Sequence, residues 1–276
     1  MTRLRLPKVR VALVLAMLVV GGIAGASPAG ASGEMTLSFR AVAGADGVRV
    51  GMDVLEGAAS RAQAVLDSSH ESRALAAQPY APSPGAYPLM VASDHPGVPA
   101  QTVETSEHGG YRLRASSNEK ASEAYAASGA FDQLASVVAS KAVARVADEA
   151  RWVAAGAVST FEGVTAGPLH LATVSSSADV RRLPTGELER RSSLAVTGIS
   201  ILGQEVRLTD QGIVAVGATT PLPSSDPLLV ALAEAGVTVS YLGSRDTPTG
   251  VIAPGLRIET GNVVITLGQA SAAVDS

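Results

Sequence analysis

The chain has 276 residues, a formal net charge of −4 at pH 7, no cysteine and only 3% aromatic residues. An acidic chain with few aromatic rings lacks both the basic stripe that binds phosphates and the rings that stack on single strands, so we expect no nucleic-acid partner. Without cysteine there is no disulfide framework, and the fold depends on its core alone. Hydrophobic residues make up 46% of the chain, many of them alanine, which predicts a thin core or closely packed elements.

Residues 1–31 have the pattern of a secretory signal peptide. A basic head precedes an uninterrupted apolar run from Val11 to Val20, and small residues then precede two possible cleavage sites, after Ala31 and after Ala26. The apolar run is far shorter than the ~20 residues that span a bilayer. We therefore expect a secreted protein, extracellular or loosely associated with the cell envelope. Cleavage is expected after Ala31, with Ala26 as the alternative, and no membrane span is expected in the mature chain.

The stretch 32–276 is predicted to form a single β-rich domain. Apolar and polar residues alternate through 35–54 on both sides of Asp46-Gly47, which predicts a hairpin that turns at this dipeptide. A second pair of strands is predicted at 62–68 and 72–78.

Two segments of this domain have unusual composition. Prolines are dense from 79 to 99, which predicts an extended surface strap because proline cannot donate to a strand ladder. The Ala-rich segment 122–151 is compatible with a helix by propensity, but its valines among Ser and Ala also suit a closely packed strand. We favour strand for most of it.

The clearest prediction is a long hairpin that pairs 169–183 with 187–201. Pro184-Thr185-Gly186 suits a three-residue loop with Gly186 at positive φ. This loop pairs residues whose numbers sum to 370, and the register satisfies charge pairing near the tip and apolar pairing at the base. The pairs are Asp179 with Arg191, Arg181 with Glu189, Val174 with Val196, Leu171 with Ile199, and Leu169 with Ile201. Strands of this length, roughly 50 Å, must twist.

One short helix is predicted near 227–235. Ser225 or Asp226 provides the N-cap, Pro227 occupies the first turn, and Gly236 ends the helix. A weak internal repeat, 161–167 against 196–203, favours successive long strands that turn back at glycines. The expected fold class is therefore mainly β (β-rich α+β), a long twisted antiparallel meander with one short helix.

Four segments carry a resemblance to known proteins through their order and spacing. They are Ala62–Ser68, Tyr87–Gly97, Val196–Gln204 with Leu208–Gly212, and the Leu-rich helix followed by Gly236-Val237. These segments resemble a group of uncharacterised exported Ala/Ser/Gly-rich β proteins of high-GC Gram-positive bacteria, with no assigned activity. The resemblance implies an exported, strand-rich single domain and implies no chemistry.

One polar segment contains the residue types of a hydrolytic site. Asp67, Ser68, Ser69 and His70 include the side chains of a hydrolytic triad, but neighbours along a turn point in different directions, and no Gly-x-Ser-x-Gly elbow is present. We interpret this segment as a polar turn.

The metal-site candidates have unfavourable spacing. Asp94-His95 and Glu107-His108 lie in Pro/Gly-rich segments without the tight ligand spacing of secreted metal sites. His170 lies between Leu169 and Leu171, so we expect its side chain on the solvated face of a strand. The arginines of the hairpin tip, which are Arg181, Arg182, Arg190 and Arg191, are nearly neutralised by Asp179, Glu187 and Glu189, which favours a solvated tip. We expect no catalytic, cofactor-binding or metal-binding residue.

These observations favour a non-enzymatic extracellular or cell-envelope protein with a structural or partner-binding role. Its partner would be a cell-envelope component. The alternative is a carrier of an apolar, lipid-like small molecule, held in a groove between the ribbon and the helix. A secreted hydrolase is the third hypothesis.

Overall fold

The computed structural model describes residues 38–276 except 53–54, 59, 79–88, 106–110, 129, 132–134 and 147–151. The described chain is mainly β, with antiparallel sheets and one short helix, as the sequence predicts. Among the described residues, no helix is long and apolar enough to span a bilayer.

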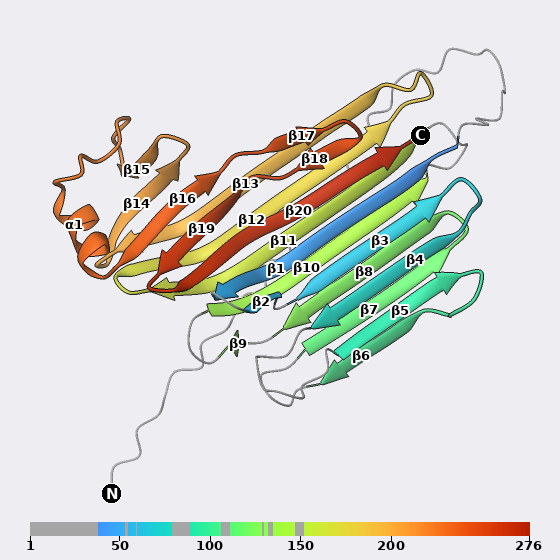
Figure 1. Ribbon diagram of the computed structural model, residues 1–276, viewed down its shortest axis with the longest axis horizontal. Helices are drawn as coiled ribbons and strands as arrows, with labels where there is room; N and C mark the ends of the chain where they lie inside the picture. Colours follow the sequence, from blue (N-terminus) through green and yellow to red (C-terminus); the bar gives the residue numbers. More distant parts are fainter. Residues whose placement is uncertain are drawn as a thin grey trace, which may run out of the picture. The chain divides into compact units, whose positions relative to one another are not determined.

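Two antiparallel sheets contain all the strands of the described residues (Figure 1). The first, sheet A, runs in the order β16 (Val237–Leu242), β19 (Gly255–Thr260), β20 (Val263–Asp275), β1 (Arg40–Met52), β3 (Arg61–Asp67), β4 (Ser72–Gln78) and β5 (Leu89–His95). Three short strands join it: β2 (Leu55–Ala58) pairs with β1, and β17 (Arg245–Thr247) pairs with β18 (Gly250–Ile252), which pairs with β20.

Sheet B is a long meander, followed in the chain by the helix. Its order is β15 (Gly212–Ala215), β14 (Gln204–Thr209), β13 (Leu188–Ile201), β12 (Leu169–Arg182), β11 (Val153–Ala166), β10 (Ala135–Val146), β8 (Ala121–Ser128), β7 (Tyr111–Asn118) and β6 (Gln101–Thr105), with β9 (Ala130–Phe131) on β10. The helix, α1, spans Pro227–Glu234. The segment 122–151 is therefore β-strand wherever it is described, which confirms the favoured alternative.

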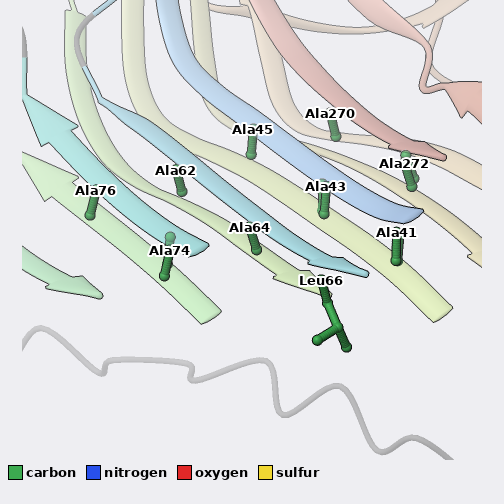
Figure 2. Close-up of a cluster of buried hydrophobic side chains, with 14 of the residues drawn as sticks. Ala41, Ala43, Ala45, Ala62, Ala64, Leu66, Ala74, Ala76, Ala270 and Ala272 are labelled. Carbon is green, nitrogen blue, oxygen red and sulfur yellow. The ribbon is translucent and has the colours of Figure 1, made fainter. Parts of the chain in front are cut away.

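The inner faces of the two sheets pack against each other in two chemically different regions. The first, the alanine layer, is a buried cluster built mostly from alanines of both sheets, and Figure 2 shows the part contributed by sheet A. Its alanines are Ala41, Ala43, Ala45, Ala62, Ala64, Ala74, Ala76, Ala115, Ala124, Ala126, Ala155, Ala157, Ala178, Ala253, Ala270 and Ala272. Each is at most 4% exposed. This confirms the prediction of closely packed elements.

The second region, the leucine layer, is filled by large side chains and includes the helix. Its buried members are Phe161, Val164, Ala166, Leu169, Leu171, Val174, Ile199, Ile201, Val206, Leu228, Leu232, Val237, Leu256, Ile258, Ile265 and Leu267. Strands β11, β12 and β20 pass through both layers, so the change in composition occurs within single strands. The two layers therefore share one backbone framework.

Serine hydroxyls, of the buried Ser122 and the half-buried Ser117, bridge the two sheets. The hydroxyl of Ser122 on β8 donates to the Arg73 carbonyl on β4 at 2.6 Å, and the hydroxyl of Ser117 on β7 donates to the Ser93 carbonyl on β5 at 2.6 Å. Covalent geometry then places a backbone oxygen of one sheet within roughly 5 Å of a Cα atom of the other. Packed sheets are usually about 10 Å apart, so the sheets approach unusually closely here.

A polar seam separates the two layers. Ser159 on β11 donates to the Asp46 carbonyl at 2.6 Å, and Ser176 on β12 donates to the Pro254 carbonyl at 2.8 Å, and both serines are fully buried. Gly268 lies opposite Ser176, where a Cβ atom would approach the serine Cβ to 2.8 Å. Its φ of +81° also requires glycine.

The predicted hairpin at 35–54 is wrong. Within the described residues of that segment, β1 is one continuous strand that pairs with β20 along its whole length and also with β3. The register does not change across Asp46-Gly47, since Asp46 pairs with Gln269 and Val48 with Leu267, and the Gly47 N–H donates to the Ser60 carbonyl. The turn-forming dipeptide is kept in a strand because partners on both sides hold its flanks.

The predicted surface strap at 79–99 contains a strand. Residues 89–95 form β5, the edge strand of sheet A, and residues 79–88 lie outside the described part of the chain. No proline occurs between Pro88 and Pro96, so every residue of β5 keeps its backbone N–H. The predicted pair 62–68 and 72–78 is confirmed as β3 and β4.

The long hairpin is confirmed in the predicted register. Leu171 pairs with Ile199 and Arg181 with Glu189, and Gly186 has a φ of +86°. Two further positive-φ glycines, Gly163 and Gly198, lie on the strands either side of Ala172, where all three strands are irregular. The predicted helix is confirmed as well, with Asp226 as its N-cap.

Candidate functional site

The outer edge of β13 is unpaired over most of its length. Strand β14 pairs with β13 only at Ile199, Ser200 and Ile201. No described strand pairs with the outer edge over residues 188–198, although the opposite edge of β13 is paired with β12 at every residue except Gly198. Eleven consecutive residues therefore present a free sheet edge.

The hairpin geometry identifies which backbone groups this edge offers. The Leu183 N–H donates to the Glu187 carbonyl at 2.9 Å. Residue pairs of an antiparallel ladder alternate between bonded and non-bonded, so odd-numbered residues of β13 bond to β12. The even-numbered residues from Leu188 to Val196 direct their N–H and C=O groups outward, which is the pattern that accepts another strand.

Arg190 fastens this edge to sheet A. Its guanidinium donates to three backbone carbonyls of the β17–β18 turn: Gly250 at 3.0 Å, Thr247 at 3.2 Å and Pro248 at 3.0 Å. Because its side chain is engaged on the inner side of sheet B, Arg190 is a structural group. It holds the tip of the β12–β13 ribbon in place.

The outer face beside the tip carries paired charges. The Arg181 guanidinium stacks over the Trp152 ring at 4.7 Å and lies 4.0 Å from the Glu189 carboxylate. Burial raises the pKa of the Asp179 carboxyl, and the charges of Arg191 and Arg181 oppose this effect. Of the tip arginines, Arg181 has a carboxylate partner, as predicted, whereas Arg190 binds backbone carbonyls of sheet A and is not part of a solvated tip.

The residues with triad chemistry form a polar turn. The Asp67 carboxylate accepts hydrogen bonds from the Ser69 N–H at 3.0 Å, the Ser69 hydroxyl at 2.6 Å and the Glu71 N–H at 3.1 Å. His70 is exposed, has a φ of +63°, and donates its backbone N–H to the Asp67 carbonyl. The carboxylate thus serves the backbone of its own loop.

Only one of the two metal-site candidates, Asp94-His95, lies within the described residues. Asp94 forms an ion pair with Arg73 at 3.4 Å, and Glu107-His108 lies outside the described residues. Within the described ranges, no three His, Asp or Glu side chains gather closely enough to hold a metal ion. His170 is exposed and contacts the Thr165 hydroxyl at 3.2 Å, so its predicted position on the solvated face is confirmed.

The carrier hypothesis places an apolar groove between the long ribbon and the helix, and side chains of the helix fill this space. Leu228 and Leu232 of α1 are 8% and 4% exposed and pack into the leucine layer. The sequence analysis did not predict the free β13 edge, although the sequence contains a signal for it: the strand after Gly203 is too short to cover a 14-residue strand.

No protein-family model, curated protein or solved structure matches this chain.

Proposed function

We propose that the chain is exported and acts as a non-enzymatic protein of the cell envelope or its surroundings. In this role it binds an extended segment of an envelope protein as an added strand. The observation that carries the proposal is the free edge of β13 over residues 188–198. The signal-like pattern of residues 1–31 supports export.

The edge favours a strand as its occupant. Alternate residues point their N–H and C=O groups outward, and a partner backbone satisfies such a row without any particular side chain. Ala195 and Thr197 are exposed, and the small or short side chains on this part of β13 leave room for an adjacent strand. The residues that guard the edge against indiscriminate pairing are Arg191 near the tip and Gly198 at the irregularity.

The rigid framework supports a structural or partner-binding role. Strand β12 is paired on both sides, and the serine bridges and the Arg190 contacts fix sheet B to sheet A. A preformed edge loses little conformational entropy when a partner strand is added.

The test compares two substitutions at one residue of the edge. Ser192→Pro removes an outward N–H without removing a bond to β12, whereas Ser192→Ala keeps it. The full chain is produced in an exporting bacterial host, and its recovery with washed envelope fractions is measured. We expect wild type and Ser192→Ala to be retained and Ser192→Pro to be released.

Thermal melting shows whether Ser192→Pro is folded. If the folded Ser192→Pro protein is retained as well as wild type, the edge is not the binding surface. N-terminal sequencing of the exported protein tests cleavage after Ala31 or Ala26. A chain that stays inside the cell with residues 1–31 intact contradicts the proposal as a whole.

A further inference from the structure

A pocket lies on sheet A where β20 changes partners. Strand β20 pairs with β19 as far as Leu267 and with β18 from Ser271 onward, so Gly268, Gln269 and Ala270 lie between the two partner strands. The chain that connects β18 to β19 crosses this gap, and the Ala253 N–H donates to the Ala270 carbonyl at 2.9 Å. The pocket at this junction has a volume of about 290 Å³.

The polar seam explains why this pocket is not filled by protein. The buried Ser176 hydroxyl of sheet B donates to the Pro254 carbonyl at 2.8 Å and so holds the crossing segment against the other sheet. Gly255 and Gly268 line the pocket without side chains that could fill it. A Cβ atom on Gly255 would lie 2.5 Å from the Leu267 carbonyl oxygen, so this position accepts no larger residue.

The pocket combines apolar walls with one cation. Leu242 and Ile252 line it together with Arg245 and Gln269. Arg245 pairs directly with Ile252, and Ile252 with Ser271, so Arg245, Ile252 and Gln269 share the outer face of the sheet. Within the described residues, the Arg245 side chain has no ion-pair or hydrogen-bond partner.

We propose that this pocket binds a small carboxylate with a short apolar tail. Arg245 pairs with the carboxylate, Gln269 offers an amide donor beside it, and Leu242 and Ile252 contact the tail. The volume is close to the lower limit of pockets that hold organic ligands, roughly 300 Å³, which restricts the tail to a few carbons. This site is separate from the β13 edge, so either proposal stands without the other.

The experiment titrates the full chain with three six-carbon probes by calorimetry and by NMR shift mapping. The probes are hexanoate, hexan-1-ol and hexylammonium, which share a tail and differ in head group. We expect hexanoate to saturate one site with a Kd on the order of 0.1–1 mM, as its size allows. Hexan-1-ol should bind at least about fivefold more weakly, and hexylammonium should bind least because Arg245 repels it.

Matched variants assign the site. Arg245→Gln should weaken hexanoate binding to the level of hexan-1-ol, and Ile252→Glu should abolish it by placing a competing carboxylate beside Arg245. Arg257→Gln is the control, since Arg257 is an exposed arginine of β19 that pairs with Glu259 at 2.8 Å. Its hexanoate affinity should equal that of wild type.

Any of three results would overturn the proposal. The first is no saturable binding of hexanoate up to about 10 mM, tenfold above the expected range. The second is equal affinity for hexanoate and hexan-1-ol, and the third is an equal loss of hexanoate affinity in Arg245→Gln and Arg257→Gln. Binding to the folded Ser192→Pro variant should be unchanged. A failure of the carboxylate-binding proposal can therefore be distinguished from a failure of the strand-binding proposal.

Discussion

The alanine layer and the leucine layer stabilise the same pair of sheets in different ways. In the leucine layer, side chains such as Leu267 and Ile258 are fully buried and remove a large apolar area from water. Each alanine buries much less area, so the alanine layer gains less hydrophobic free energy per residue. It gains instead a close approach of the two backbones, which lets buried serines such as Ser122 reach carbonyls of the opposite sheet. Small side chains therefore bury less apolar area but allow hydrogen bonds between the two sheets.

The largest expected effect lies in the leucine layer. Leu267→Ala removes a fully buried side chain and leaves a cavity, and we expect a loss of about 2–5 kcal/mol in the free energy of unfolding. Urea denaturation measures it. Leu202→Ala is the control, because Leu202 is 62% exposed and its truncation should cost less than about 0.5 kcal/mol. Equal losses would mean that the leucine layer is not a packed core.

The opposite substitution tests the alanine layer. Ala64→Leu adds volume between sheets already in contact and should cost about 1–3 kcal/mol through overpacking. Gln63→Leu, on the exposed neighbour, introduces the same side chain outside the sandwich and should leave stability nearly unchanged. A stabilised Ala64→Leu protein would show that the alanine layer contains unfilled space.

The serine bridges should contribute a smaller amount. Ser122→Ala removes the hydrogen bond to the Arg73 carbonyl, and we expect a loss of about 1 kcal/mol. Ser193→Ala removes an exposed hydroxyl contact with Ser177 at 2.8 Å and should have almost no effect. Thermal denaturation of the two variants compares them, and identical melting temperatures would argue against a stabilising role for the buried bridge.

The smallest effect concerns the outside of the sandwich. Burial raises the pKa of Asp179 above its usual value. This carboxyl therefore adds to the free energy of unfolding at pH values below its unfolded pKa, and the contribution is lost as the pH rises through the folded pKa. Asp179→Asn should remove this pH dependence and change stability at pH 7 by no more than about 0.5 kcal/mol. Denaturation across pH 3–7 measures it, and a large loss at pH 7 would show that the ionised carboxylate is a stabilising partner of the arginines.

The sequence predicted the features that depend on neighbouring residues. Pro184-Thr185-Gly186 fixed the register of β12 and β13, and Asp226 and Gly236 bounded the helix. The prevalence of alanine also predicted close packing. In each case local turn chemistry, capping or side-chain size determined the outcome.

The sequence did not predict features that depend on contacts between residues far apart in the chain. The Asp46-Gly47 dipeptide favours a turn, but β20, more than 200 residues later, keeps it in a strand. The pocket arises because Ser176 holds the Pro254 carbonyl, a contact that joins separate sheets. The free β13 edge also depends on where β14 leaves it. Local patterns do not specify which strands meet across a sandwich.

A crystal structure provides the most direct test of the claim that small side chains bring the sheets together. The quantity to measure is the separation of the two sheets in each layer. We expect it to be well below the usual ~10 Å around Ser122 and Ala64, and near 10 Å around Leu267. A uniform separation of about 10 Å, or a water layer between the sheets at the alanines, would contradict the account.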